Sequence, residues 1–350
     1  MKIGLYGMPS AGKSFILDRI DFMEVAAGSK LLRQYDPDFD VRNSSEKEVD
    51  RKTLAKMLSR KSDFIMDGHY AFGSEKVFTE DDGNLYDAFL YLYTDPEILK
   101  TRMMSSEKNQ KYAKYDIVEW QDCEINELRE YCHLNNKDFY ILDNPPDNFF
   151  SGVDKVIEFI RAVKNGYSCV NYAKSCVDEI IRNCHGDTIT LLDGDKTITI
   201  EDSSNRVFGY TTHLYDGNFY TGYQAWNQGI EFSCYSVPEL TELPVHINDS
   251  VLSHVRIDSF ILTSGHEKVW KFISGQLQIP FFAGTQMCAE TKFYITKFLQ
   301  EADKKIIAFG DGMNDYYMLK QADIGYLIRK PDGKISRSLK NRDLEGLRIV

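Results

Sequence analysis

Polar residues suited to phosphoryl transfer stand at the ends of three apolar stretches in the second half of the sequence. A carboxylate can attack phosphorus when Mg²⁺ and a lysine offset its charge, and a second carboxylate can protonate the leaving oxygen and then deprotonate water. Neighbouring hydroxyls can hold a phosphate oxygen. The residues of these types, in chain order, are Asp193, Asp195, Thr263, Ser264, Lys292, Asp311 and Asp315.

Each acid has an expected role. Asp193 is the candidate nucleophile, and Asp195 is the candidate general acid and base. Asp311 and Asp315 lie in the segment GDGMND and, with Asp193 and Asp195, are candidate ligands of Mg²⁺, because this hard cation takes oxygen ligands. A structural turn would explain Asp-Gly-Asp alone, but it would not explain four acids in this order. We therefore predict a Mg-dependent phosphatase that works through an aspartyl-phosphate.

These motifs resemble those of the haloacid dehalogenase superfamily of phosphatases. GDGMND followed by YYMLKQADIG is most similar to the phosphoserine-phosphatase-like members, and the resemblance covers about residues 185–330. It implies that Ser264 is the phosphate-binding hydroxyl and Lys292 the charge-neutralising lysine, with Thr263 and Lys297 as the competing candidates. It also implies a small cap domain inserted after the first motif.

A second chemical motif stands near the N-terminus. Residues 7–14, GMPSAGKS, match the pattern GxxxxGK[ST], after an apolar stretch and before a helical one. In such a loop the backbone N–H groups and the following helix N-terminus face phosphates, the lysine reaches the outer phosphates, and the last hydroxyl joins the Mg²⁺ shell. The motif predicts ATP and Mg²⁺ binding through Gly7, Pro9, Ser10, Ala11, Gly12, Lys13 and Ser14.

Further residues of the first half are candidates for the same site. Asp67 ends the stretch DFIMD and is a candidate base or metal-side acid, with a turn cap as the structural alternative. Arg102 lies on an expected helix and is a candidate nucleotide contact. Three lysines within 108–114 suggest either a lid over ATP or a solvated helix face. We expect His69 to be structural.

The first 165 residues resemble the nucleoside-monophosphate-kinase-like branch of P-loop kinases, including the archaeal adenylate-kinase type. The matching pieces are GMPSAGKS, AAGSKLLRQ, DFIMDGHY and LYTDPEILKTR. The resemblance implies phosphoryl transfer from ATP to an acceptor held at the carboxyl edge of a parallel sheet.

Apolar stretches alternate with helical patterns in both halves, which predicts an α/β fold of two domains, each a parallel sheet flanked by helices. We expect a P-loop kinase domain at 1–164, a linker at 165–168, and a haloacid-dehalogenase-like, Rossmann-like phosphatase domain at 169–350. Residues 198–255 break the rhythm and are expected to form the cap. Its aromatic residues are expected to pack together, with closure over a substrate as the alternative: Tyr215, Phe219, Tyr220, Tyr223 and Trp226.

Composition narrows the function classes. A net charge of −11 disfavours general affinity for nucleic-acid backbones, which depends on clustered cations. Seven cysteines without CxxC spacing predict reduced thiols rather than disulfides or a zinc site. The N-terminus lacks a long apolar segment, and we expect a cytoplasmic protein without membrane association. The basic residues of 329–348 are expected to form a solvated tail.

Together these features predict a bifunctional enzyme, an ATP-dependent kinase of a nucleotide or other small metabolite joined to a phosphomonoester phosphatase. Two alternatives stay open. One is a polynucleotide 5′-kinase/3′-phosphatase that heals nucleic-acid ends, which makes nucleic acid the less favoured partner. The other is a phosphatase regulated by a P-loop that binds nucleotide as a switch.

Overall fold

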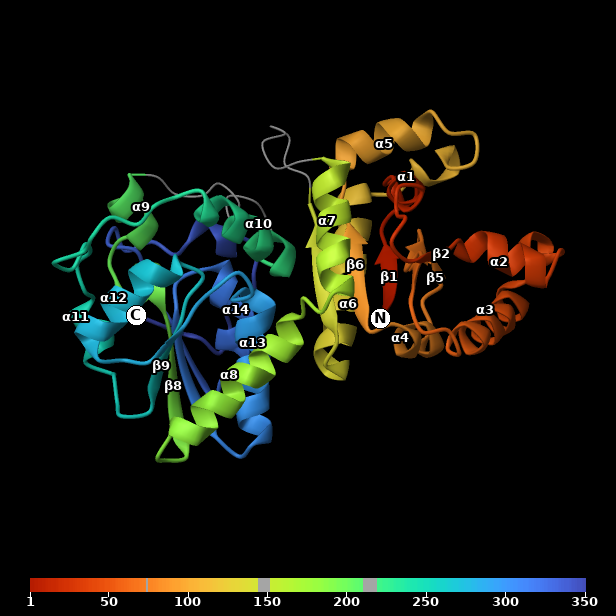
Figure 1. Cartoon of the computed structure of the whole chain (residues 1–350). Coiled ribbons are helices and arrows are strands. Elements are labelled where there is room, and N and C mark those ends of the chain that lie inside the picture. Colours follow the sequence, from red (N-terminus) through yellow and green to blue (C-terminus); the bar gives the residue numbers. More distant parts are fainter. Residues whose placement is uncertain (74, 144–151, 210–218) are drawn as a thin grey trace. The chain divides into compact units, whose positions relative to one another are not determined.

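The computed structural model describes residues 1–73, 75–143, 152–209 and 219–350. The chain divides into two compact units, Met1–Tyr167 and Ser168–Val350 (Figure 1). Each unit contains a parallel β-sheet flanked by helices, so the α/β prediction is confirmed. Among the described residues, no helix combines the length and the apolar character needed to cross a bilayer.

The first unit is built on a five-stranded parallel sheet with the order β2-β3-β1-β6-β7. A short antiparallel pair, β4 (Ala71–Phe72) and β5 (Glu75–Lys76), follows β3. Residues of β1, β6 and β7 are almost all buried, as expected for strands covered on both faces. The strands of the sheet are β1 (Lys2–Tyr6), β2 (Glu24–Ala26), β3 (Phe64–Asp67), β6 (Ala88–Leu92) and β7 (Asp138–Leu142).

Local sequence signals account for several helix starts in this unit. Asn43 and Thr79 each begin a capping box, and Asp95 caps a helix whose first residue is proline. The helices are α1 (Lys13–Leu17), α2 (Gly28–Tyr35), α3 (Ser44–Leu58), α4 (Glu80–Leu85), α5 (Pro96–Met104), α6 (Ile117–Asn135) and α7 (Val153–Lys164), with 3₁₀ turns η1 (Phe39–Val41) and η2 (Gln110–Tyr112).

The second unit contains a six-stranded parallel sheet with the order β10-β9-β8-β11-β12-β13. Its strands are β8 (Thr188–Asp193), β9 (Ser259–Leu262), β10 (Phe281–Phe282), β11 (Lys305–Gly310), β12 (Ile324–Leu327) and β13 (Arg348–Ile349). Its helices are α8 (Cys169–Asn183), α9 (Ser203–Phe208), α10 (Gly222–Ser233), α11 (Asp249–Leu252), α12 (Glu267–Leu277), α13 (Ala289–Glu301) and α14 (Met313–Gln321), with the turns η3 (Gly194–Ile198) and η4 (Arg337–Leu339).

Helices cover both faces of this second sheet. Because successive strand residues point to opposite faces, Leu191 and Ala308 enter one core with α8, α13 and α14. Their neighbours Leu192 and Phe309 enter another core with α11 and α12. The central strands are thus fixed from both sides, and their carboxyl ends form a rigid edge for polar side chains.

The end of the chain corrects one expectation. Its basic side chains are largely exposed, but the backbone is not a free tail, because β13 pairs with β12 and extends the sheet. Arg348 also donates to the hydroxyl of Tyr326 at 2.9 Å. The two-residue strand β13 is too short, and its neighbours too highly charged, for the sequence pattern to predict it.

The expected cap interval holds α9, α10, α11 and a bridge between Thr199 and Ile247. Its aromatic residues Phe219 and Tyr223 are buried. Tyr215 lies outside the described residues.

Candidate active sites

The order of the second sheet brings the predicted phosphatase residues together. Strands β9, β8 and β11 are neighbours and run parallel, so their carboxyl ends lie at one edge. Asp193 ends β8, Ser264 follows β9, and Asp311 follows β11. Ligands bind at this edge in open parallel sheets.

Three of the four predicted metal acids form a tight cluster. Asp193, Asp311 and Asp315 each offer a carboxylate oxygen within 4.8 Å of the others. Burial and the neighbouring carboxylates raise the pKa of Asp311 well above its ordinary value. A set of three converging carboxyl groups fits a divalent cation with oxygen ligands, such as Mg²⁺.

Lys292 reaches this cluster from helix α13. Its Nζ donates to Oδ1 of Asp193 at 2.5 Å and to Oδ1 of Asp315 at 2.7 Å, and its side chain is 0% exposed. Although burial disfavours the ammonium, the two carboxylates raise the pKa of Lys292 above its ordinary value. Burial raises the pKa of Asp193 to about 7, Asp315 adds to the rise, and Lys292 opposes it. The competing Lys297 instead pairs with Glu301 at 3.8 Å.

The second oxygen of Asp193 and the hydroxyl of Ser264 have partners that we did not predict. Thr197 donates to Oδ2 of Asp193 at 3.1 Å. Asn314 donates from Nδ2 to Oγ of Ser264 at 2.7 Å, and Ser264 donates to the carbonyl of Met287 at 2.5 Å. Asn314 stands inside GDGMND, and its amide in that motif was the signal available.

The competing hydroxyl of Thr263 is turned toward its own loop. It accepts from the backbone N–H of Gly265 at 3.0 Å, and the residue is almost fully buried. Ser264 is therefore the hydroxyl that lies beside Asn314 at the edge where the acids gather.

Asp195 lies apart from the three clustered acids. Its Oδ1 accepts from the backbone N–H of Ser203 at 2.7 Å, and its Oδ2 accepts from Nε1 of Trp270 at 3.3 Å. Burial, followed by the charge of Asp202, raises the pKa of Asp195 to about 6, with Ser203 opposing the rise. A carboxyl group with this environment is suited to carrying a proton near neutral pH.

One comparison with known proteins reaches these residues. A family model of haloacid dehalogenase-like hydrolases matches residues 290–336. The matched segment contains Lys292 and both acids of GDGMND. No curated protein is significantly similar to the chain in sequence.

Solved structures similar to parts of the chain include a kinase and two hydrolases. Shikimate kinase from Acinetobacter baumannii is 12% identical with a TM-score of 0.35, and the match covers 48% of this chain and 95% of the kinase. A haloacid dehalogenase family hydrolase from Salmonella enterica serovar Typhi is 16% identical with a TM-score of 0.30, covering 48% and 69%. A phosphoserine phosphatase, solved as a phospho-aspartyl intermediate analogue, is 15% identical with a TM-score of 0.28, covering 41% and 87%.

The P-loop of the first unit lies between β1 and α1. Gly7 has a φ of 146°, and a Cβ there would lie 2.8 Å from the carbonyl oxygen of Leu92, so only glycine fits. Lys13 is buried and donates to the carbonyls of Gly7 and Met8, the latter at 3.1 Å. Burial lowers the pKa of Lys13 to about 8, and Glu124 and Asp67 oppose the shift. The lysine is thus held at the loop.

Residues before, within and after α5 flank the P-loop. Asn109 donates to Oγ of Ser10 at 2.9 Å, and Thr94 donates to the carbonyl of Ala11 at 3.1 Å. A Cβ on Gly12 would lie 3.9 Å from Nη1 of Arg102, which places this arginine beside the loop. Two further P-loop positions differ in exposure, with buried Pro9 and exposed Ser14.

Asp67 ends β3 and accepts at Oδ1 from the backbone N–H of Gly28, the first residue of α2, at 3.0 Å. Asp67 therefore connects β3 to the start of α2, and it also interacts electrostatically with Lys13. His69 lies with its ring 4.6 Å from that of Phe72, and burial lowers its pKa well below the ordinary value. The neutral ring fits the structural role expected for it.

A buried acid that we did not predict lies near Lys13. Glu124 of α6 is 1% exposed and accepts from the N–H of Ala71 at 3.1 Å, the hydroxyl of Tyr91 at 2.7 Å and Nε1 of Trp120 at 3.0 Å. Glu124 lies four residues after Trp120 and four before Leu128, so helical periodicity places it on the apolar face of α6, and this was the signal available.

The lysine-containing segment 108–114 is packed through an aromatic residue, Tyr112. Lys111 lies over the ring of Tyr112 at 5.0 Å, and this ring contacts Phe72 at 5.7 Å and Trp120 at 5.9 Å. The segment is thus packed on β4 and α6 through its tyrosine, with Lys111 exposed.

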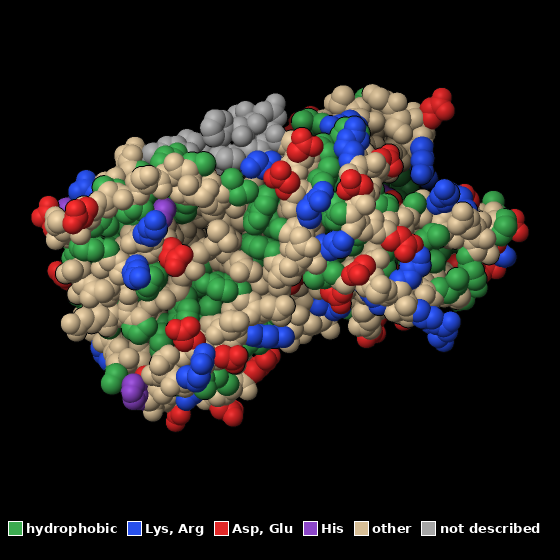
Figure 2. Space-filling model, in the orientation of Figure 1, with side chains coloured by type: hydrophobic (Ala, Val, Ile, Leu, Met, Phe, Trp, Pro, Cys, Tyr) green, Lys and Arg blue, Asp and Glu red, His purple; other side chains and the backbone are tan. Residues whose placement is uncertain are grey.

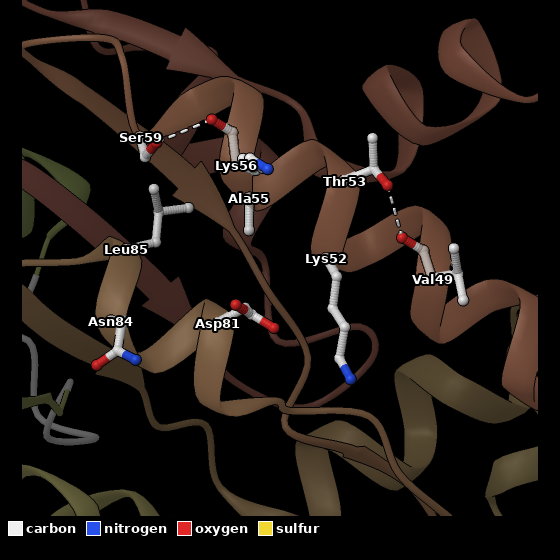
Figure 3. A pocket seen from close by; sticks show the side chains of 9 residues that line it. All are labelled: Val49, Lys52, Thr53, Ala55, Lys56, Ser59, Asp81, Asn84 and Leu85. Atoms are coloured by element: carbon white, nitrogen blue, oxygen red, sulfur yellow. Dashed lines mark hydrogen bonds between the residues drawn. The ribbon is translucent and has the colours of Figure 1, made fainter.

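A cavity of about 490 Å³ lies elsewhere in this unit, between α3 and α4 (Figure 3). Ser59, one of its lining residues, accepts at its carbonyl from Nζ of Lys2 at 2.7 Å. Lys2 begins β1, whereas the P-loop follows the end of β1. The cavity therefore belongs to the amino edge of the sheet and not to the P-loop site.

Proposed function

We propose that the chain is a bifunctional phosphoryl-transfer enzyme. The second unit is proposed to hydrolyse small phosphomonoesters with Mg²⁺ through an aspartyl-phosphate. The observation that carries this proposal is the buried contact of Lys292 with both Asp193 and Asp315, beside Asp311. Burying charged groups carries a desolvation penalty, and carboxyl groups with strongly shifted pKa values cluster at functional sites.

The phosphatase reaction proceeds in two steps. An oxygen of Asp193 attacks phosphorus while Asp195 gives its proton to the leaving oxygen, so that the P–O bond breaks as the aspartyl-phosphate forms. Asp195, now a carboxylate, takes a proton from the water that hydrolyses the phosphoenzyme. Ser264 and Asn314 hold phosphate oxygens, and Lys292 offsets their charge. Mg²⁺, held by Asp193, Asp311 and Asp315, would offset the charge between nucleophile and substrate.

The first unit is proposed to bind ATP and transfer its outer phosphoryl group to a small acceptor. The P-loop amides and Lys13 hold the phosphates, Arg102 stabilises the transferred charge, and Ser14 would be a ligand of Mg²⁺. Asp67 is the proposed base or metal-side acid. The net charge of −11 supports small substrates over polynucleotides, and acidic and basic side chains are interspersed on the face visible in Figure 2.

The phosphatase half is tested with radiolabelled phosphomonoesters and Mg²⁺. Acid quench should trap label on the wild-type chain, and Asp193→Asn should abolish both label and turnover. Asp187→Asn, which changes an exposed acid just before β8, is the matched control and should retain both. Full turnover by Asp193→Asn would refute the assignment.

The kinase half is tested with γ-labelled ATP against nucleosides, nucleotides, sugars and 5′-hydroxyl oligonucleotides. Lys13→Ala should remove transfer, whereas Lys61→Ala, just before β3 at the opposite edge, should not. Transfer confined to oligonucleotide ends would select the end-healing function. ATP hydrolysis that needs no acceptor would select the switch.

A further inference from the structure

Both carboxylate oxygens of Asp195 are held by donors that cannot accept a proton. The backbone N–H of Ser203 donates to one oxygen at 2.7 Å, and the indole N–H of Trp270 donates to the other at 3.3 Å. Neither an amide N–H nor an indole N–H has a lone pair to offer. These two N–H contacts therefore orient the carboxyl group of Asp195 without taking its proton.

Trp270 is held firmly enough to orient its partner. It is 0% exposed and packs in the core that contains Leu192, Val269 and Ile273. Its ring also abuts two motif glycines. A Cβ at Gly194 would lie 2.5 Å from the ring, and a Cβ at Gly265 would lie 2.2 Å from Nε1. A rigid core thus determines where this N–H points.

We propose that Trp270 is a positioning residue of the phosphatase, which aims the proton of Asp195 at the leaving oxygen of the substrate. The proposal rests on the proposed phosphatase function. In the step concerned, the Asp193–phosphorus bond forms, the phosphorus–leaving-oxygen bond breaks, and the proton of Asp195 moves to that oxygen. Ser203 N–H holds the second carboxylate oxygen in the same step.

The proposal predicts a dependence on the leaving group. An alkoxide is a poor leaving group and needs the proton, whereas p-nitrophenolate leaves without it. A misaimed general acid should therefore slow alkyl phosphates selectively, because proton transfer requires correct geometry. A loss of packing alone should slow both esters alike.

The experiment measures first-turnover release of the leaving group by rapid quench, with an alkyl phosphate and with p-nitrophenyl phosphate. Trp270→Phe, which keeps an apolar ring without the N–H, should slow the alkyl ester about 10- to 100-fold and p-nitrophenyl phosphate less than about threefold. Ile273→Val alters the same core and helix without touching Asp195, and should leave the ratio of the two rates unchanged.

A second variant covers the case in which Trp270→Phe fails to fold. Ser203 is the first residue of α9, where proline is tolerated, and Asp202 before it is already extended. Ser203→Pro removes the other donor and places its Cδ against the carboxylate, so it displaces Asp195 and should produce the same selective loss. Equal slowing of both esters by the folded variants would overturn the proposal.

Asp195→Asn separates this failure from failure of the proposed function. If it slows the alkyl ester selectively while Trp270→Phe and Ser203→Pro do not, Asp195 is the acid and the positioning role is wrong. If Asp195→Asn slows both esters equally, the acid assignment itself fails, and the positioning role fails with it.

Discussion

The ammonium of Lys292 lies 2.7 Å from a carboxylate oxygen of Asp315 in a part of the core that solvent does not reach. Both side chains are at most 1% exposed, and Asp193 contacts the same ammonium. The ammonium is thus the buried partner that both carboxyl groups share, and its removal would leave them unpaired in the core.

Lys292→Met should therefore destabilise the second unit by about 3–5 kcal/mol in EDTA, since it leaves buried acids without their partner. Mg²⁺ should restore more stability to the variant than to the wild-type chain, because a bound cation replaces the lost charge. Urea unfolding with and without Mg²⁺ measures both effects. Lys297→Met on the same helix is the control, and an equal loss there would contradict the prediction.

Asn314→Ala should weaken phosphate binding. The variant removes an amide that is proposed to hold a phosphate oxygen and that donates to Ser264, whose hydroxyl keeps only the carbonyl of Met287 as its partner. We expect inorganic phosphate to inhibit about tenfold less well, corresponding to about 1.4 kcal/mol. Inhibition constants measure this, with Asn183→Ala at the end of α8 as the control. An unchanged inhibition constant would show that Asn314 does not contribute to phosphate binding.

Two glycines should respond to alanine in opposite directions. Gly265→Ala places a methyl group against Trp270 and should cost about 1–3 kcal/mol. Gly275 lies in α12, where an added methyl group would meet nothing within 4 Å, and Gly275→Ala should stabilise by about 0.5–1 kcal/mol. Thermal denaturation distinguishes the two. An unchanged melting temperature for Gly265→Ala would contradict the close packing of the Trp270 ring against this glycine.

Glu124→Ala should destabilise the first unit by about 2–3 kcal/mol, because three buried donors lose their acceptor. Glu124→Gln keeps one acceptor oxygen and should cost less. Glu130→Ala changes an exposed glutamate on the same helix and should stay within about 0.5 kcal/mol. Denaturant unfolding of the three variants provides the comparison, and similar losses at both positions would contradict it.

Much of the proposed phosphatase site could be predicted from the sequence because its residues follow the ends of strands. Apolar runs followed by Asp193, Ser264 and Asp311 predict that these residues meet once the strands are parallel and adjacent. The P-loop was readable for a similar reason, since its glycines and lysine are consecutive. In both cases the geometry is local to a strand and the turn after it.

The partners of those residues depend on contacts between distant segments. Trp270 reaches Asp195 across 75 positions, and Asn109 reaches Ser10 across 99. The charged C-terminal segment resembled a solvated tail, yet its last residues pair with β12 because an open sheet edge offers unpaired backbone groups.

By itself the sequence determined the α/β class and the chemical types of the site residues, because periodicity and motif spacing are local properties of the chain. Only the tertiary structure decided that Lys292 contacts the acids and that Ser264 pairs with Asn314. It also decided that Asp195 stands apart from the three clustered carboxylates and that Trp270 and Ser203 hold it. These choices depend on helix packing against the sheet, which brings together residues that no sequence window contains.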